Sequence, residues 1–256
     1  MANAKNKNVP YPRRLARSLR SRISDGILLL RCLKPGLIWL YQNRHLRMDA
    51  NEPVNDVRRR DFHKDRYFFA ADYIKANIKT GMTVLDAACG TGYGSDILKN
   101  TLQAQVFGVD ISPQAIDYAA RKYGGKGCVF KTGDVTRLSG FSEEYFDVVV
   151  SFETIEHIEE PMVFLEKIKS LLKPGGVLIL STPNLWGKTK DHKRDYDYQM
   201  LVDQVKRFFR LEEIYAQNSG CLDLWINRNC PRRLVKAEQE NIKTAECFIA
   251  VCRKEG

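Results

Sequence analysis

Short apolar runs alternate with longer amphipathic stretches through most of this 256-residue chain. Runs of this kind, bounded by glycine, proline and acidic residues, predict buried strands. The amphipathic stretches predict helices over 55–78, 161–172 and 198–209, and two more that begin after Gly94 and at Ser112-Pro113. Because strands and helices alternate, the pattern predicts an α/β fold. The predicted strands are 84–86, 105–110, 128–132, 146–151, 177–181, 211–217 and 245–253.

The first predicted strand runs directly into a glycine-rich loop. The strand ends at Asp86, and Gly90, Gly92 and Gly94 follow before a helix-like segment. Glycines let the backbone turn sharply and let a ligand approach where a Cβ would stand in the way. The first amides of the following helix can donate to an anionic or polar group. A dinucleotide fingerprint would need a glycine at position 95, where this chain has Ser95, so the fit to a nicotinamide site is imperfect.

Three acidic residues stand at the ends of successive predicted strands. Asp86 suits a ligand with an amino group or a sulfonium better than it suits a pyrophosphate. Asp110 lies 18 residues beyond Gly92, close to the distance at which an acid meets a ribose diol, and its carboxylate can accept from both hydroxyls. Asp134 follows the third strand. Their shared position at strand ends indicates a ligand site, since α/β sheets bind ligands beyond the carboxyl ends of their strands.

The segment 84–94, Val-Leu-Asp-Ala-Ala-Cys-Gly-Thr-Gly-Tyr-Gly, resembles motif I of the class I S-adenosylmethionine-dependent methyltransferases. The turn Leu171-Leu-Lys-Pro-Gly-Gly176 and the strand exit Ser181-Thr-Pro-Asn184 resemble the same family, and the resemblance extends over about residues 60–253. It implies a Rossmann-like seven-stranded sheet flanked by helices, whose last strand is antiparallel and forms a hairpin with the sixth. It also implies S-adenosylmethionine as the cofactor, but it does not transfer the substrate. Our hypothesis for the acceptor is a small-molecule, sugar-linked or lipid-linked group, most simply a hydroxyl. The nearest members act in quinone, sugar and surface-glycan biosynthesis.

The resemblance also assigns roles to residues. Asp86 and the glycine loop would hold the amino acid part of the cofactor, Asp110 the ribose and Asp134 the adenine, with the next amide reading the ring. The segment from His63 to Tyr67 would lie over the methionine part, although an ordinary amphipathic helix explains it equally well. The cofactor-binding residues implied are Tyr67, Asp86, Ala88, Gly90, Gly92, Asp110, Ile111, Asp134, Val135 and Phe152.

Two histidines are candidates for the catalytic base that a hydroxyl acceptor would need. His157 follows the fourth strand, and imidazole titrates in the useful range. Its alternative role is to hold the loop through backbone hydrogen bonds. His192 follows the fifth strand in a segment that loosely resembles a His-x-x-Glu-Tyr piece of related enzymes, with Asp195 as the acid. No metal-ligand cluster stands out, and no Asp/Asn-Pro-Pro-Tyr signature of DNA-base methylation follows strand four.

Charge is concentrated at the N-terminus. Residues 1–47 contain 11 Lys or Arg and one acid, Asp25, which accounts for the whole net charge of +10. We therefore divide the chain into a basic helical extension, 1–55, and a methyltransferase domain, 56–256. The extension is interpreted as a cap over the active site or as a peripheral contact with an anionic membrane; nucleic acid is disfavoured because aromatic residues are sparse there. Residues 27–41 are too short and interrupted to span a bilayer.

Seven cysteines without CxxC pairs indicate reduced thiols in the cytoplasm rather than disulfides or a zinc site. Three other functions compete with a small-molecule methyltransferase. A nicotinamide-dependent reductase is disfavoured by Asp86 and Ser95. An RNA methyltransferase recruited by the basic arm and a non-catalytic binding module with the same fold remain alternatives, because function depends on lids and loops grafted on a shared scaffold.

Overall fold

The structure is a computed structural model that describes residues 57–78, 81–185, 191–218 and 233–256. The predictions for the basic arm, 1–55, lie outside these residues. In the part of the chain that is described, no helix combines the length and the apolar character needed to cross a bilayer.

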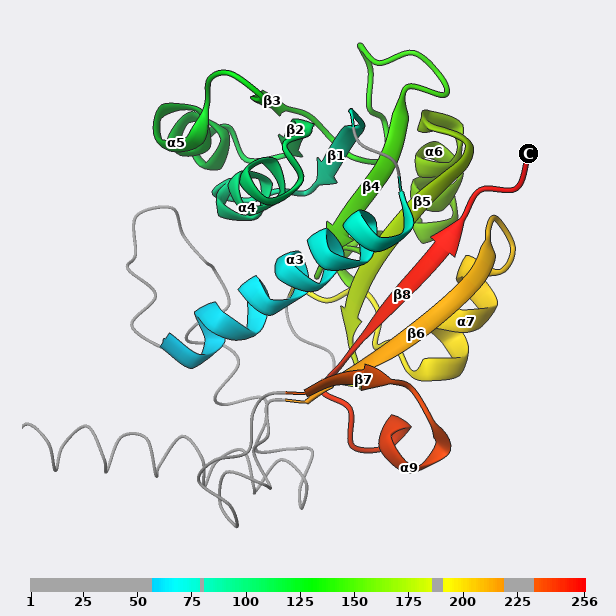
Figure 1. Ribbon diagram of the computed structural model, residues 1–256. Coiled ribbons are helices and arrows are strands. Elements are labelled where there is room, and N and C mark those ends of the chain that lie inside the picture. The colour runs from blue at the N-terminus through cyan, green and yellow to red at the C-terminus, as the bar shows by residue number, and fades with distance from the viewer. Residues whose placement is uncertain (1–56, 79–80, 186–190, 219–232) are drawn as a thin grey trace, which may run out of the picture.

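A mixed eight-stranded sheet runs through the centre of the molecule (Figure 1). Its order is β3-β2-β1-β4-β5-β8-β6-β7. Neighbours from β3 to β5 are parallel, whereas β8 is antiparallel to both β5 and β6, and β7 is antiparallel to β6. The bounds are β1 Thr83–Ala87, β2 Gln105–Asp110, β3 Cys128–Thr132, β4 Phe146–Phe152, β5 Leu172–Pro183, β6 Arg210–Asn218, β7 Arg233–Lys236 and β8 Cys247–Arg253.

Seven of these strands correspond to the predicted ones, and the expected antiparallel hairpin of the last strand with the sixth is confirmed. The eighth, β7, falls between the predicted strands 211–217 and 245–253, where the sequence pattern predicted no strand. Its four residues, Arg-Leu-Val-Lys, are too few for a period-two pattern, and the pairing of Tyr215 with Lys236 and of Ala216 with Val235 makes them a strand. The fifth strand also begins earlier than predicted, at Leu172, because the Lys-Pro-Gly-Gly turn interrupts its pairing with β4 without ending it.

Helices cover both faces of the sheet (Figure 1). On one face lie α3 Val57–Asn77, α4 Tyr93–Leu102 and α5 Pro113–Tyr123; on the other lie α6 Pro161–Leu171 and α7 Tyr198–Val205. The predicted helix 198–209 is shorter than expected, since it ends at Val205. Two short pieces complete the described part, the 3₁₀ turn η1 Ile155–His157 and α9 Gln239–Ile242.

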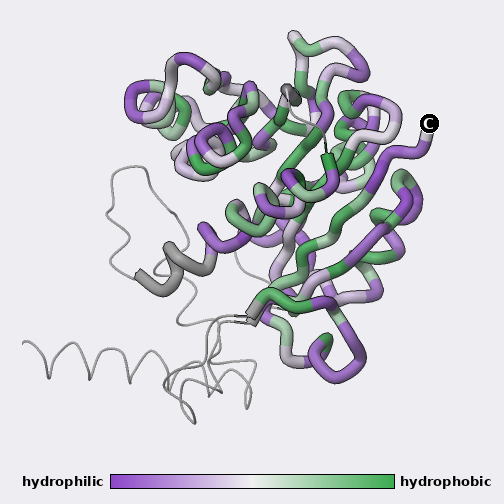
Figure 2. Tube along the Cα trace, viewed as in Figure 1, coloured by the Kyte–Doolittle hydropathy of each residue, from purple (hydrophilic) through white to green (hydrophobic). Residues whose placement is uncertain are grey.

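Alternate residues of the buried strands supply the two hydrophobic cores, and Figure 2 shows apolar residues along these central strands. Val84 and Val148 pack with Ile74 of α3 and Leu98 of α4 in one core. In the other core, Leu85, the next residue along β1, packs with residues of α6 and α7. This alternation follows from the period of two in a strand that is buried on both faces.

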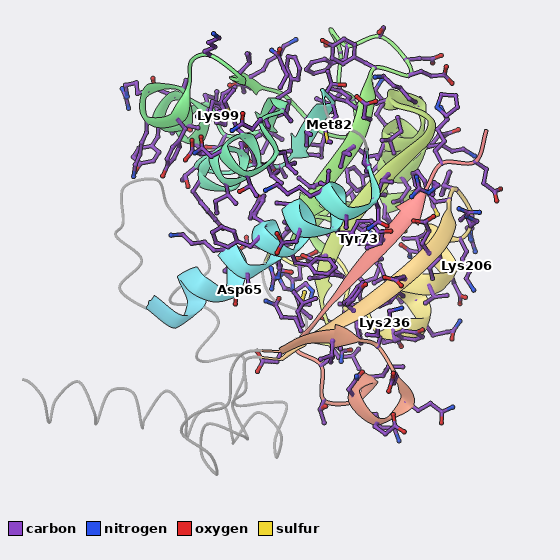
Figure 3. All side chains as sticks on the ribbon, in the orientation of Figure 1. Asp65, Tyr73, Met82, Lys99, Lys206 and Lys236 are labelled. Atoms are coloured by element: carbon purple, nitrogen blue, oxygen red, sulfur yellow. The ribbon has the colours of Figure 1, made fainter. Side chains whose placement is uncertain are left out.

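α3 is fixed across the sheet rather than along one strand. Its buried residues are Arg66, Tyr67, Ala70, Ala71 and Ile74. Farther along the helix the Tyr73 hydroxyl, labelled in Figure 3, donates to Glu212 Oε2 of β6 at 3.0 Å. The helix therefore joins β1 and α4 to the antiparallel side of the sheet, and this placement brings its residues to the candidate site.

Candidate functional site

The loop between β1 and α4 turns through backbone conformations that favour glycine. Ala88 has φ 66°, Gly90 φ 54° and Gly92 φ 81°. A Cβ added at Gly92 would stand 2.6 Å from Ala119 Cβ and 2.8 Å from the Phe130 ring, so this glycine is required by space as well as by φ. A Cβ at Gly90 would meet nothing within 4 Å. The loop is thus packed against α5 on one side and open beside Gly90.

The start of α4 has unused hydrogen-bonding capacity. The helix begins after Gly92 without a side-chain cap, so its first amides lack the partner that a cap would supply. Gly94 in this first turn lies directly against the ring of Tyr67, where an added Cβ would be 2.0 Å from Cζ. Such a helix start can bind a carboxylate or phosphate.

Asp86 lies beneath the loop and has no exposed surface. Its Oδ2 accepts from Ser95 Oγ at 2.6 Å and its Oδ1 from Tyr67 Oη at 3.2 Å. Burial raises the pKa of Asp86 to about 7, against the opposing effect of these two hydroxyl donors. The Asp86 carboxylate therefore links α3 to α4 beneath the loop, and the role expected for it in holding the amino acid part of the cofactor stays a prediction.

Asp110 and the exit of β3 lie side by side. The half-buried carboxylate of Asp110 accepts from Gly90 N and from Ser112 N, both at 2.9 Å, and the Asp110 carbonyl accepts from Gly133 N. Next to it, Ile111 presents an apolar side chain that is 71% exposed. An acid beside an exposed isoleucine suits a nucleoside: the carboxylate can accept from the ribose hydroxyls, and the apolar side chain can pack against the face of the base.

Asp134 and Val135 follow β3. Asp134 is exposed, and its Oδ1 accepts from the backbone and the hydroxyl of Thr136 at 2.8 and 2.7 Å, while Val135 is buried. Phe152, at the end of β4, packs edge-on against Tyr67 with ring centroids 4.8 Å apart. The structure thus connects Tyr67, Asp86 and Phe152 on one side of the loop.

A buried ionic network lies at the β4 exit, and the sequence analysis did not identify it as a unit. Arg66, fully buried, donates from Nε to Gln217 Oε1 at 2.6 Å, and its Nη1 is 3.1 Å from Glu153 Oε1. Glu153 has φ 52° and accepts from Ser181 Oγ at 3.2 Å. Burial raises the pKa of Glu153, but Arg66 and His63 outweigh burial and hold it below its usual value. The network fastens α3 to β4 and β6.

Both candidate catalytic histidines lie just beyond this network and contact each other. The rings of His157 and His192 are 4.8 Å apart in an edge-on arrangement. His157 Nδ1 lies 2.9 Å from the Asp191 carbonyl oxygen, so the loop-holding role considered for this residue has a visible contact. His192 is 7% exposed, and burial together with His157 lowers its pKa to about 4.

Glu156 completes this group, and sequence reasoning missed it. It is 1% exposed, and burial together with the nearby Glu153 raises its pKa well above the usual range. One ligand atom from each of Glu156, His157 and His192 lies within 4.8 Å of the others. The available signal was the spacing Glu153-x-x-Glu156-His157 at the exit of a buried strand. The partner His192, from 35 residues later, has no local signal.

Comparison with known proteins places this arrangement in a wider group. The family model described as "Methyltransferase domain" matches residues 85–180, from within β1 to within β5. Over 117 residues the chain is 35% identical to a ubiquinone biosynthesis O-methyltransferase of Xanthomonas campestris, covering 44% of this chain and 48% of that protein. It is 33% identical over 109 residues to phosphoethanolamine N-methyltransferase 1 of Triticum aestivum, covering 42% and 22%. The chain spans about half or less of the length of these curated relatives.

Solved structures share the fold at lower identity. A putative methyltransferase in complex with the Trm112 activator of Haloferax volcanii superposes with a TM-score of 0.61 at 20% identity, over 77% of this chain and 93% of that one. An S-adenosylmethionine-dependent methyltransferase from Mesorhizobium loti gives 0.55 at 15%, over 73% and 100%. The [4+2]-cyclase SpnF gives 0.56 at 16%, over 73% and 80%. SpnF shows that this fold is not confined to proteins named for methyl transfer.

Proposed function

We propose that this chain, which belongs to the class I S-adenosylmethionine-dependent methyltransferases, transfers the methyl group of that cofactor to a hydroxyl of a small-molecule acceptor. The observation that carries the proposal is the glycine loop before the uncapped start of α4, with the half-buried Asp110 and the exposed Ile111 beside it. The resemblance between this loop and the family's motif I, and the match over residues 85–180, support it.

The residues present fit the cofactor. The uncapped amides of α4 suit its carboxylate, Asp110 suits the ribose diol, and Ile111 with Val135 offers apolar surface for the base. When bound, S-adenosylmethionine supplies a methyl group that is already activated on a sulfonium. The work left to the chain is to orient the acceptor and to exclude water. Tyr67, whose ring packs on Gly94 and Phe152, closes the loop on the α3 side.

A hydroxyl acceptor also has to lose a proton. The side chains placed for this at the same edge of the sheet are His157 and His192, after β4 and β5. The ubiquinone O-methyltransferase relatives favour an oxygen acceptor, and the phosphoethanolamine relative makes an amine the second candidate. Sugar-linked and lipid-linked hydroxyls belong to the same proposal.

The first test is calorimetric titration with S-adenosylhomocysteine, with NADH in parallel. We expect binding of S-adenosylhomocysteine alone, weakened about 10- to 100-fold by Asp110→Asn, since a charged hydrogen bond contributes about 1.5–3 kcal/mol. Asp117→Asn, on the exposed face of α5, is the matched control. Binding of NADH instead, or an Asp110→Asn protein with unchanged affinity, would contradict the cofactor assignment.

The acceptor is tested by mass spectrometry after incubation with S-adenosylmethionine and a panel of phenols, catechols, sugars and phosphoethanolamine. A methylated phenol or alcohol supports the proposal, whereas methylation of the amine alone would replace it with the second candidate. If the cofactor binds but no acceptor in a broad panel, including RNA, is methylated, a binding module becomes the better description.

The basic arm is proposed as a peripheral contact with anionic membrane, which would bring the domain to a lipid-linked acceptor. The supporting observation is that residues 1–47 of the arm contain 11 basic residues and one acid. Sedimentation with anionic vesicles should be lost when residues 1–47 are removed, and persistence of binding would refute the proposal. RNA binding that falls steeply with salt and depends on the same residues would favour the RNA alternative.

A further inference from the structure

Glu156, which lies beside His157 and His192, has a feature that the hydrogen bonds of the described residues do not explain. Glu156 Oε2 accepts from Thr182 Oγ1 at 3.1 Å, but Oε1 is buried and has no hydrogen-bond partner among the described residues. A buried carboxyl oxygen that makes no hydrogen bond carries a considerable free-energy cost. His157 Nε2 lies 3.8 Å from this oxygen, which is beyond hydrogen-bonding range.

The contact of His157 with the neighbouring loop defines its tautomer. The partner of Nδ1 is the carbonyl oxygen of Asp191, which can only accept. Nδ1 therefore carries the hydrogen, and in the neutral ring Nε2 presents its lone pair toward Glu156 Oε1. A second ring nitrogen that donates to a carbonyl is also what orients histidines that bind metals. Glu156 Oε1 and His157 Nε2 thus face each other, 3.8 Å apart, as two candidate metal ligands.

The loop that carries His192 is fastened to the same turn by backbone hydrogen bonds. The Glu156 carbonyl accepts from Lys193 N at 2.8 Å and from Arg194 N at 3.3 Å. The Arg194 guanidinium donates to the carbonyls of Ile158 and Glu159, both at 2.7 Å. Two segments far apart in sequence are therefore held in fixed relation, as a preorganised ligand set requires.

From this geometry we propose that Glu156, His157 and His192 bind one divalent first-row transition metal ion, of the zinc or cobalt type, through one carboxylate oxygen and two imidazole nitrogens. Ligand atoms about 2.0–2.2 Å from a tetrahedral zinc lie about 3.3–3.6 Å apart. The 3.8 Å between Glu156 Oε1 and His157 Nε2 is close to this spacing, and the set as a whole, which lies within 4.8 Å, has to close by up to about 1.5 Å around the ion. Two imidazoles favour Zn²⁺ or Co²⁺ over Mg²⁺, which prefers oxygen ligands.

Glu153 is not part of this ligand set, although it stands three residues before Glu156. Its carboxylate is held by Arg66 at 3.1 Å and by Ser181. The ligand set therefore carries one negative charge and has three protein ligands, which is the number found in catalytic zinc sites that keep a further position open.

The role of this metal ion rests on the proposed function, the methylation of a hydroxyl. An acceptor hydroxyl at the open position would bind the cation as a Lewis base, which lowers its pKa and lets its proton pass to water as the oxygen is methylated. In that arrangement the two histidines are ligands instead of bases. The substrate class that suits such a site has a hydroxyl next to a second oxygen, such as a catechol or a vicinal diol.

The test is direct metal binding by the full chain, independent of turnover. Chelator-treated protein is titrated with Co²⁺, followed by its visible spectrum, and with Zn²⁺ and Mg²⁺ by calorimetry. We expect one Co²⁺ or Zn²⁺ per chain and at least about 100-fold weaker binding in His157→Gln and in His192→Gln. This loss exceeds the roughly 10–100-fold that follows when a residue that only hydrogen-bonds to a metal ligand is replaced. Glu160→Gln, an exposed acid four residues from Glu156, is the matched control and should bind as the wild type does.

No binding of Co²⁺ or Zn²⁺, binding of Mg²⁺ alone, or affinities unchanged in both histidine variants would overturn the inference. His157 is partly exposed, so its variant tests the site even if the buried His192→Gln protein does not fold. S-adenosylhomocysteine is titrated into the same metal-free and metal-loaded samples. If it binds while the metals do not, only this inference fails. If the metals bind and it does not, the proposed function fails while the metal site stands.

Discussion

The burial of Asp86 allows a quantitative prediction of how the free energy of unfolding depends on pH. Its pKa rises from 3.8 to about 7 in the folded protein, mainly because the side chain has no contact with water. Between about pH 4 and pH 7 the folded state keeps this proton, whereas the unfolded state has released it. The free energy of unfolding must therefore fall as the pH rises through that window, and the full cost is present above pH 7.

The magnitude follows from the pKa difference. Each pKa unit corresponds to about 1.36 kcal/mol, so the contribution of Asp86 should fall by about 2 kcal/mol between about pH 5.5 and pH 8. Asp86→Asn keeps the shape of the side chain and removes the titration. The wild type should thus lose about 2 kcal/mol more than the variant over this interval. Ser95→Ala should move the loss toward higher pH, because the Ser95 hydroxyl opposes the upward shift of the Asp86 pKa.

The assay is urea unfolding followed by circular dichroism at several pH values, at constant ionic strength and without cofactor. Other buried acids titrate as well, so the quantity to compare is the difference between wild type and Asp86→Asn at each pH. Parallel curves for the two proteins would refute the argument, because they would show that Asp86 is ionised in the folded protein at low pH. The argument would also be refuted if the difference in free energy of unfolding between the two proteins changed only below pH 5.5 and stayed constant above it.

Three further predictions concern the supports of the loop. Gly92→Ala should lower the free energy of unfolding in urea by about 1–3 kcal/mol and weaken S-adenosylhomocysteine binding, because the residue has φ 81° and its Cβ would meet Ala119 and Phe130. The control is Gly175→Ala, at φ 74° with open space around it, which introduces backbone strain without crowding. Arg66→Met should destabilise the fold by about 3–5 kcal/mol because it leaves Glu153 without its cation, and adding Glu153→Gln should recover part of this loss; strictly additive losses would show that the pair is not coupled. Tyr67→Phe removes the donor to Asp86 and should cost about 1–3 kcal/mol of stability while the ring contacts remain, so a calorimetric melting temperature equal to that of the wild type would contradict the role given to the hydroxyl.

Local features of the chain determined much of the fold. Each buried strand is a short apolar run, and its period of two places Val84 on one face and Leu85 on the other whatever surrounds it. The loop at 88–94 was readable because glycine is needed wherever φ is positive or space is lacking, and both conditions hold at Gly92. The order of acids at strand ends located the Asp110 edge for the same reason, since parallel strands present their carboxyl ends together.

Contacts between distant segments decided the rest. Whether Asp86 meets a ligand or supports the loop depends on Tyr67, which arrives from a helix 19 residues upstream. β7 is a strand because β6 offers it an edge, not because its four residues demand one. His157 reads as a lone base in the sequence, yet the backbone hydrogen bonds at Glu156 bring His192 beside it and turn two separate histidines into one ligand set. Such contacts leave no periodic pattern in the sequence. The entropic cost of closing a loop rises only slowly with its length, so the number of residues between two partners is not fixed.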